Sequence, residues 1–323
     1  MVANETVDHR IDDEPGAVHS DWDRGRPPVC TIEPGEVVQF ACRDATDGQI
    51  GPDSTAADVA DLDVGPVHPL TGPVAIDGAT PGDVLEVELL DLTHEGWGYT
   101  LYPPGEMGLG LLADEFPDPG FHRWELDDEV GHFVNGIEVP LDPFPGVIGV
   151  APAAEGTHET FPPRPVGGNL DVKQLTAGAT LYLPVAVEGA LFSVGDCHAA
   201  QGDGEVCGTG LEAPMTVSCR FDLSTDRSID APQFETDHPF TPTGRDEPMY
   251  ATTGVGDDLL EATREAVRAM VDHIDGERDL TREQAYLLCS VAVDLKLNQV
   301  VNAPNWTVSA YLPESIFPES LRR

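Results

Sequence analysis

The residues with the clearest chemical capacity lie between positions 193 and 205, in the sequence SVGDCHAAQGDGE. Four groups that could bind a cation or carry a proton fall within ten residues: Asp196, His198, Asp203 and Glu205. Side chains two apart in an extended backbone point the same way, so we expect each pair to share one side. A Glu that is not a metal ligand is the usual base that activates a metal-bound water, so this segment could supply both metal ligands and a base.

Two further segments carry groups of the same kind. Asn169 and Asp171 have the same two-residue spacing, and the Asn169 amide can donate to and accept from a small amide substrate. His68 stands immediately before a proline at the entrance to an expected strand. Its ring nitrogen could complete a mixed nitrogen and oxygen site for zinc or a similar divalent ion.

Each of these residues also has an interpretation without chemistry. In a chain this acidic, Asp203 and Glu205 could be solvated surface groups, and a lone histidine such as His68 is often a hydrogen-bonded structural residue. Cys197 could be a nucleophile, although an extended strand directs it away from its two neighbours at 196 and 198. Residues 302–306 could shape a pocket or simply connect a helix to a strand.

The elements that must position these groups are mainly strands. Glycine and proline are frequent, with 33 and 29 residues, and the apolar runs between them are short. This pattern predicts a β-sandwich or barrel rather than alternating strands and helices. The clearest expected strands are 36–42, 72–76, 84–89, 179–185 and 215–223.

The pattern becomes helical near the C-terminus. Apolar residues from 257 to 275 fall on one helical stripe, and Thr281 with Gln284 has the spacing of a capping box that begins a second helix reaching Leu295. We therefore predict a mainly β fold, a β-sandwich-rich body with a C-terminal helical pair. Residues 1–30 are expected to be a peripheral arm, and 31–323 a single catalytic domain, β-rich to about 250 with a helical insertion at about 257–298.

Composition narrows the function classes. With 58 acidic and 17 basic residues, the formal net charge is −41, and the acids are spread along the chain. Such a surface repels nucleic acid and suits a cytoplasm rich in salt, which indicates halophilic adaptation. The six cysteines form no CxxC pair, and no apolar stretch is long enough for a membrane span. We expect a cytoplasmic protein.

Three long strings resemble the acetamidase/formamidase family. They are GPVAIDGATPGDVLEVELLDL, PPRPVGGNLDVKQLTAGATLYLPVAVEGALFSVGDCHAAQGDGE and LLCSVAVDLKLNQVVNAPNWTVSAYLP. The resemblance extends from about residue 36 to 316, and its most specific part is GGNxD followed by GDxHxxQGDGE. It implies a β-sandwich-rich fold with helical additions, assembly as a homo-oligomer, and hydrolysis of formamide, acetamide or related short amides.

The resemblance also implies roles for individual residues. It assigns a divalent metal, zinc or another ion such as calcium, to His68, Asp171, Asp196 and His198, with Glu205 as the base. In this hypothesis Asn169 orients the amide substrate, and Asp44, Asp203 and Cys197 stay open as further site residues. Two alternatives remain: a scaffold that binds a small metabolite without hydrolysing it, and an interaction protein that uses its acidic face.

Overall fold

Strands whose residues alternate between core and solvent build the first of two large sheets. In the strand Val84–His94, Val87 and Leu89 are buried while Glu86 and Glu88 face outward, as the sequence predicted. The computed structural model describes residues 6–107, 109–237 and 248–321, and all statements below concern these. The strand order of this sheet is β1 (His9–Ile11), β5 (Val37–Cys42), β18 (Met215–Ser224), β7 (Val84–His94), β15 (Thr180–Pro184), β19 (Gln233–Glu235).

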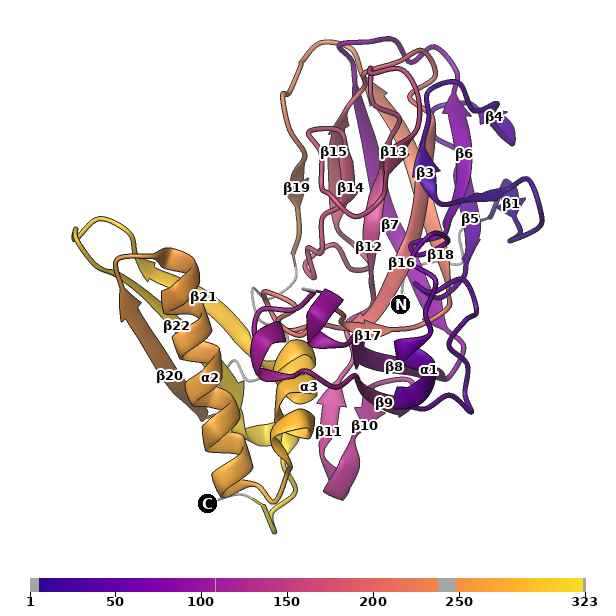
Figure 1. Cartoon of the computed structure of the whole chain (residues 1–323). Helices are drawn as coiled ribbons and strands as arrows, with labels where there is room; N and C mark the ends of the chain where they lie inside the picture. The colour runs from indigo at the N-terminus through magenta and orange to yellow at the C-terminus, as the bar shows by residue number, and fades with distance from the viewer. Residues whose placement is uncertain (1–5, 108, 238–247, 322–323) are drawn as a thin grey trace.

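The second sheet stacks on the first and carries the strand with Asp196 and His198. Phe192 of this sheet contacts Phe40 and Phe221 of the other, with ring centroids 5.6 and 4.8 Å apart, so the core lies between the two layers. The mainly β, sandwich-rich fold is therefore confirmed (Figure 1). Its strands are β11 (Glu138–Pro140), β10 (Val130–His132), β9 (Gly120–Leu126), β8 (Trp97–Tyr102), β17 (Leu211–Glu212), β16 (Phe192–Ala200), β12 (Phe144–Val150) and β14 (Gly167–Asn169), joined by β6 (Leu70–Ile76), β2 (Val18–His19) and β4 (Cys30–Ile32).

The N-terminal residues, where we expected a peripheral arm, contribute short strands to the body. Strand β1 runs parallel to β5, and β2 and β4 both pair with β6. The strand β3 (Asp21–Trp22) pairs with β13 (His158–Glu159), and Trp22 is buried. Residues 1–5 lie outside the described part of the chain. These strands are too short to show a periodicity, and pairing with distant strands fixes them.

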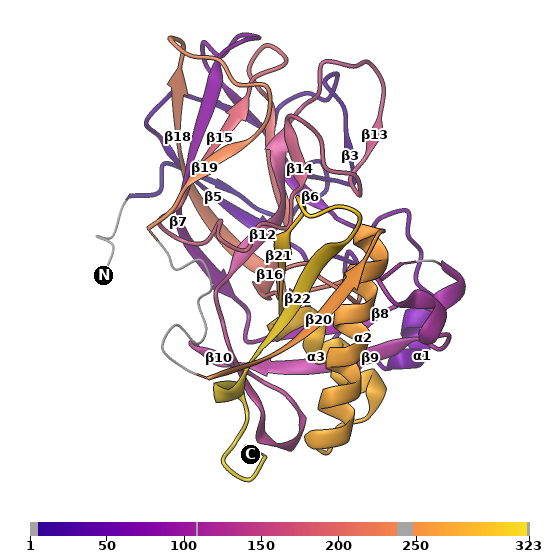
Figure 2. The same cartoon turned by 90° about the vertical axis from the view of Figure 1, so that its left-hand side faces the viewer.

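A C-terminal unit of one small sheet and two long helices projects beside the body (Figures 1 and 2). Asp258 caps the first long helix, and the expected capping box of Thr281 and Gln284 begins the second. That helix ends at Ala292 rather than Leu295. Residues 302–305 belong to the connection between two strands rather than between a helix and a strand, and Trp306 begins the second of these strands. The elements are β20 (Met249–Gly256), α2 (Leu259–Glu277), α3 (Arg282–Ala292), β21 (Asp294–Gln299) and β22 (Trp306–Pro313).

Short helices occupy the connections. The remaining helices are α1 (Ala56–Ala60) and the 3-10 helices Gly105–Met107, Ala113–Glu115, Val134–Gly136 and Glu314–Ile316. None of the helices in the described part of the chain is both long and apolar enough to cross a membrane.

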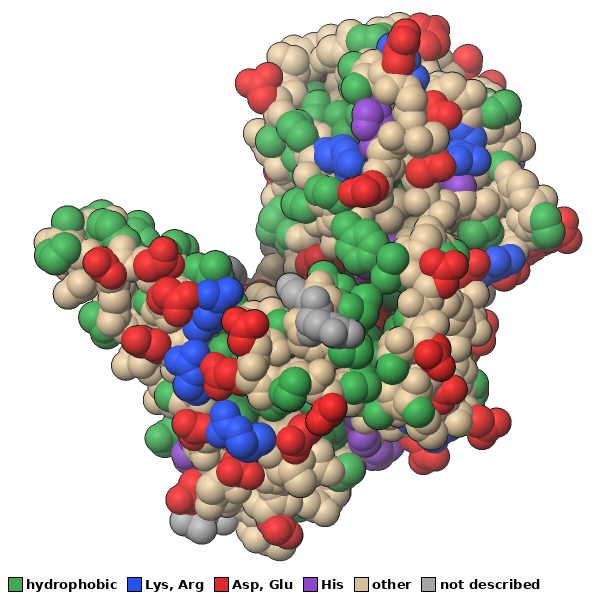
Figure 3. Space-filling view, in the orientation of Figure 1, with side chains coloured by type: hydrophobic (Ala, Val, Ile, Leu, Met, Phe, Trp, Pro, Cys, Tyr) green, Lys and Arg blue, Asp and Glu red, His purple; other side chains and the backbone are tan. Residues whose placement is uncertain are grey.

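Figure 3 shows acidic side chains spread over much of one face of the molecule rather than gathered in a patch.

Candidate active site

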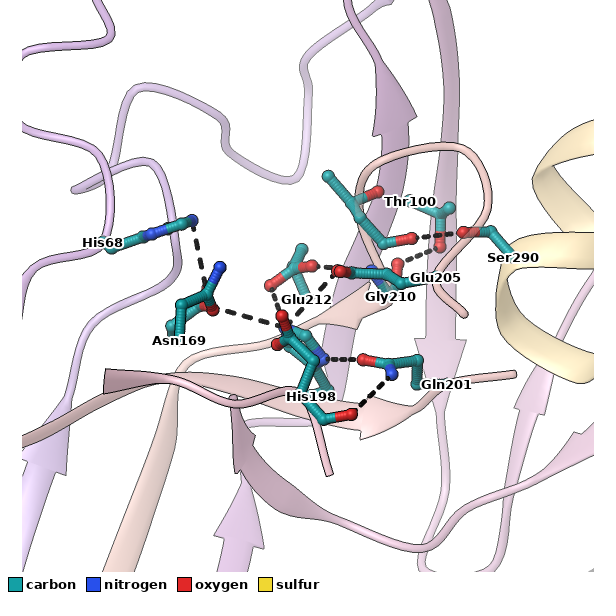
Figure 4. Close-up of polar contacts among 12 residues, drawn as sticks. His68, Thr100, Asn169, His198, Gln201, Glu205, Gly210, Glu212 and Ser290 are labelled. Atoms are coloured by element: carbon teal, nitrogen blue, oxygen red, sulfur yellow. Dashed lines mark hydrogen bonds and ion pairs between the residues drawn. The ribbon is translucent and has the colours of Figure 1, made fainter. Parts of the chain in front are cut away.

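His198 lies at the centre of a buried cluster of acidic side chains (Figure 4). Its Nε2 atom is 3.7 Å from Asp196 Oδ2 on the same strand, β16. The same Nε2 is 3.1 Å from Glu212 Oε2 on the neighbouring strand β17, and 4.0 Å from Glu205 Oε1. The expectation that Asp196 and His198 share one side of the strand is confirmed.

Two more segments bring their side chains to this cluster. Asp171 offers a carboxylate oxygen that lies, together with ligand atoms of Asp196 and His198, within a group no wider than 4.8 Å. His68 Nε2 is 3.8 Å from Asp196 Oδ2, and the His68 ring packs on Phe161 with centroids 4.5 Å apart. All four residues for which we expected metal coordination are therefore close to one another.

A second group of possible ligands overlaps the first. It consists of His198, Glu205 and Glu212, whose ligand atoms also lie within 4.8 Å of one another. Both groups contain His198, so the cluster is continuous.

The ring of His198 is fixed by contacts on the side away from the acids. Gln201 Nε2 donates to the Asp171 carbonyl at 3.1 Å, which leaves Gln201 Oε1 to accept from His198 Nδ1 at 2.8 Å. The Nδ1 atom therefore carries the hydrogen, and Nε2 presents its lone pair to the acids when the ring is neutral. Phe144 packs edge-on against the same ring, with centroids 5.1 Å apart.

Two glycines leave the room that this packing requires. A Cβ atom at Gly146 would lie 2.8 Å from Asp171 Oδ1 and 3.0 Å from Asp196 Oδ2. A Cβ atom at Gly210 would lie 2.8 Å from His198 Nδ1. All three distances are shorter than ordinary contacts, so a side chain at either position would displace the site residues.

The segment that carries Glu205 is held by helix α3. Ser290 accepts at its carbonyl from Gly202 N at 2.9 Å, and its hydroxyl accepts from Cys207 N at 3.0 Å. The same hydroxyl donates to the Thr209 carbonyl at 2.7 Å. Helix α3 of the C-terminal unit thus fixes the position of residues 202–209, which include Glu205.

Four residues of the cluster adopt a backbone conformation that side chains disfavour. The φ angles are 58° at His68, 49° at Asp171, 52° at Asp196 and 44° at Glu205. Such conformations cost on the order of 1–3 kcal/mol each and persist only where surrounding structure imposes them. Their concentration in one cluster supports a functional role for it.

Burial and mutual repulsion shift the titration of the acids. Burial raises the pKa of Asp171 and of Glu212 to about 7. Burial and then the charge of Asp171 raise the pKa of Glu205 well above its usual range. Burial also opposes ionisation of Asp196, but His68 and His198 outweigh it and lower the pKa of Asp196 to about 2. The cluster thus holds more acidic groups than its two imidazoles can neutralise.

The polar atoms of the cluster are suited to a bound cation. Among the described residues, five of its buried atoms have no hydrogen-bond partner: His68 Nδ1, Asn169 Oδ1, Asp171 Oδ1, His198 Nε2 and Glu212 Oε2. Buried polar atoms of this kind are costly unless something satisfies them. Ligand atoms on one ion lie roughly 3–4 Å apart at usual zinc–ligand distances. The distances from Asp196 Oδ2 to His68 and His198, 3.8 and 3.7 Å, fall in this range, and Asp171 belongs to a group no wider than 4.8 Å. The residues present therefore fit a divalent metal.

Other residues considered from the sequence lie elsewhere or have other partners. Asp203 and Glu205 do not share a side, because this segment turns rather than extends, and Asp203 lies 3.9 Å from Lys173 Nζ. The Asp44 carboxylate already accepts from Thr46 N, Gly48 N and Tyr99 Oη. These bonds make Asp44 a support for the site wall.

Cys197 is fully buried on the opposite side of its strand. Its contact with Cys42 and then burial raise the pKa of the Cys197 thiol well above its usual range. A thiol that resists ionisation is a poor nucleophile. The structure therefore gives no support to nucleophilic attack by this residue.

Glu212 is a site residue that the sequence reasoning missed. It is 1% exposed, and its other oxygen, Oε1, accepts from Gly210 N at 2.8 Å. The available signal was a single charged residue between Leu211 and Ala213, since a glutamate within a short apolar run is rarely buried without a purpose.

A cavity of about 210 Å³ leads from the surface to this cluster. Its polar end is formed by His68, Asn169, Asp196, Glu205 and Glu212, while most of its wall is apolar. Ligand sites commonly combine an apolar wall with a few convergent polar groups. The cavity is therefore the candidate active site.

The comparisons with known proteins agree over nearly the whole chain. The sequence profile of the Acetamidase/Formamidase family matches residues 5–159 and 152–319. The chain belongs to this family. A formamidase of Methylophilus methylotrophus is 28% identical over 98% of this chain and 93% of its own. An acetamidase of Mycolicibacterium smegmatis is 30% identical over 88% of each chain.

A solved structure shows that the fold of this acetamidase/formamidase family member is shared. The gamma lactamase from Delftia acidovorans superposes with a TM-score of 0.88 at 28% identity, covering 96% of this chain and 93% of that one. The family expected from the sequence is confirmed, and with it the enzyme class, an amidohydrolase that acts on linear amides.

Proposed function

We propose that this family member hydrolyses a small neutral amide to the carboxylate and ammonia at the cluster centred on His198. The observation that carries the proposal is the convergence of four acids and two imidazoles, with five unsatisfied buried atoms, at the closed end of a small cavity. The formamidase and acetamidase relatives support the reaction class. The gamma lactamase relative makes cyclic amides a second substrate type to test.

Each residue has a role that its geometry supports. His68, Asp171, Asp196 and His198 would hold a divalent metal, which in such sites polarises a carbonyl and acidifies water. Glu205 lines the cavity, is partly accessible at 20% exposure, and takes the proton from the attacking water before passing it to departing ammonia. Asn169 Oδ1 has no partner among the described residues, although its Nδ2 donates to Phe161 O, so Oδ1 can accept from the substrate NH₂ group.

The direct test is ammonia release combined with metal analysis. We expect the purified protein, in molar potassium chloride, to contain zinc or another divalent ion and to release ammonia from an amide panel that includes a γ-lactam. A protein that binds amides tightly and releases no ammonia from any of them would instead support a non-hydrolytic binding role.

We propose a salt-rich cytoplasm as the working environment. All six cysteines are free, as is usual in a reducing compartment, and the charge of −41 is distributed over the chain. Lowering the salt from about 1 M to 0.1 M lengthens the Debye length from about 3 to 10 Å, so the acidic side chains repel one another again.

We therefore expect the Tm in 0.1 M potassium chloride to fall by roughly 10 °C or more, at about 2–4 °C per kcal/mol. Differential scanning calorimetry at matched pH would measure it, with sucrose added to one low-salt sample to separate screening from general osmolyte stabilisation. Equal Tm values at both salt concentrations would contradict halophilic adaptation.

We also propose that the chain forms a homo-oligomer through the C-terminal unit. Hydrophobic side chains are visible at its projecting tip in Figure 3. Val300 and Val301, in the connection between β21 and β22, are 49% and 80% exposed, and Leu297 near the end of β21 is 62% exposed. These three side chains cover little of this chain's own core, and a second copy of the chain would cover them with a surface that tolerates the same high salt.

The double substitution Leu297→Asp with Val301→Asp is expected to lower the molar mass in light scattering in molar salt. Asn302→Asp adds charge to the same exposed loop without removing apolar surface, so it serves as the control. An unchanged molar mass for the double variant would contradict assembly through the C-terminal unit.

A further inference from the structure

The cavity is larger than formamide or acetamide requires. Its volume of about 210 Å³ is about seven times the roughly 30 Å³ share of one water molecule. A small amide would occupy only the polar end and leave the rest to water. Since that water would face apolar walls, a larger substrate that displaces it would bind with a more favourable free energy.

The wall beyond the polar end is mostly apolar, and the hydroxyl groups of Thr46, Tyr99 and Thr209 in it are bonded within the protein. Ala45 and Leu101 are buried in it, and Leu62 and Val67 are partly buried. At the mouth, hydrophobic side chains stay exposed to solvent: Val64 is 49% and Met107 41% exposed. Exposed apolar groups at the mouth of a cavity are covered when an apolar ligand binds.

The charge of the lining excludes one class of acyl group. Among the described residues that line the cavity there is no lysine or arginine, and Asp196, Glu205 and Glu212 are present. A substrate with a carboxylate on its acyl chain would find no cationic side chain along the wall. The acyl group is therefore not anionic, and the apolar wall that includes Leu62, Val67 and Leu101 gives a cationic group no partner beyond the polar end.

We propose that the preferred substrate is an amide whose acyl group is uncharged, apolar and about four to six carbons long. This inference rests on the proposed amide hydrolysis and adds the substrate class. The carboxamide lies among His68, Asn169 and Glu205, and the acyl chain runs along Leu62 and Leu101 toward the mouth. Formamide and acetamide are then slow substrates of this chain.

The test is kcat/KM for a homologous series from formamide to hexanamide in molar potassium chloride. We expect a rise of about fourfold per added methylene until the cavity is filled. 4-Methylpentanamide and succinamate have the same shape and differ in charge, so succinamate is expected to be at least a hundredfold slower. A maximum at formamide, with a fall for every longer chain, would overturn the inference while leaving amide hydrolysis in place.

A variant that fills the cavity gives a second, independent readout. Ala45→Leu places three more carbons in the wall and should lower the ratio of kcat/KM for 4-methylpentanamide over acetamide tenfold or more. Ala153→Leu makes the same change on the exposed surface and should leave that ratio as it is. If Ala45→Leu does not fold, Val64→Ser at the mouth should lower the ratio about threefold.

The outcomes separate the two levels of the proposal. Ammonia from no amide at all would overturn both the hydrolysis and the acyl preference. A ratio that neither Ala45→Leu nor Val64→Ser changes would overturn the acyl assignment alone, because acetamide turnover would still report a working enzyme.

Discussion

Glu205→Gln is expected to lower kcat by about 10²–10⁴, with the fold and the metal content retained, which is the usual contribution of a positioned general base. The glutamine has the same shape but cannot accept the proton of the attacking water. Glu205 lines the cavity together with Asp196, and its Oε1 lies 4.0 Å from His198 Nε2, so the carboxylate lies beside the proposed metal ligands. Ammonia release under saturating substrate measures the loss.

Glu212→Gln is the control that separates the two glutamates of the cluster. The Glu212 side chain is 2% exposed, against 20% for the Glu205 side chain, so water reaches Glu205 far more readily. We assign Glu212, whose Oε2 lies 3.1 Å from His198 Nε2, to the group of possible ligands around His198 and not to the proton transfer. Full kcat in Glu205→Gln together with a large loss in Glu212→Gln would transfer the role of base to Glu212.

Removal of the metal is expected to lower activity at least a hundredfold and to reduce Tm. Without a cation the acids Asp171, Asp196, Glu205 and Glu212 repel one another in a buried space, and their unsatisfied atoms remain. Dialysis against a chelator in molar potassium chloride, elemental analysis and calorimetry would measure the effect. Re-addition of single ions, zinc and calcium among them, would identify the one that restores turnover.

A pair of identical substitutions tests where the ion binds. Asp196→Asn should lose most of the bound metal, because Asp196 belongs to the group of three ligands with Asp171 and His198. Asp203→Asn makes the same change seven residues along the chain, on the side that faces Lys173, and should keep the metal. Equal metal content in the two variants, or full activity after chelation, would exclude the proposed ligand set.

The fold was largely predictable because its strands carry local signals. The alternation in Val84–His94 and the capping box at Thr281 both depend on neighbours in sequence, and both were confirmed. The end of α3 was misplaced because the apolar run continues beyond Ala292 into a strand, and only pairing with β22 shows the change. The N-terminal strands were missed for a similar reason, since distant partners define them.

The site was predictable where two residues share a strand and less so elsewhere. Asp196 and His198 meet because both belong to β16. Asp203 and Glu205 do not, because hydrogen bonds to Ser290 in α3 turn that segment. Glu212 joins through the pairing of β17 with β16, a long-range contact that no spacing within one segment encodes.

The left-handed backbone at His68, Asp171, Asp196 and Glu205 limits the replacements that can be interpreted. Asparagine adopts that conformation more readily than alanine, and valine and isoleucine adopt it least readily. A scan with alanine would therefore mix conformational penalty with lost chemistry at these positions. The same constraint acts in evolution. A β-branched residue at any of these four positions would destabilise the fold through its backbone conformation, whatever its effect on catalysis.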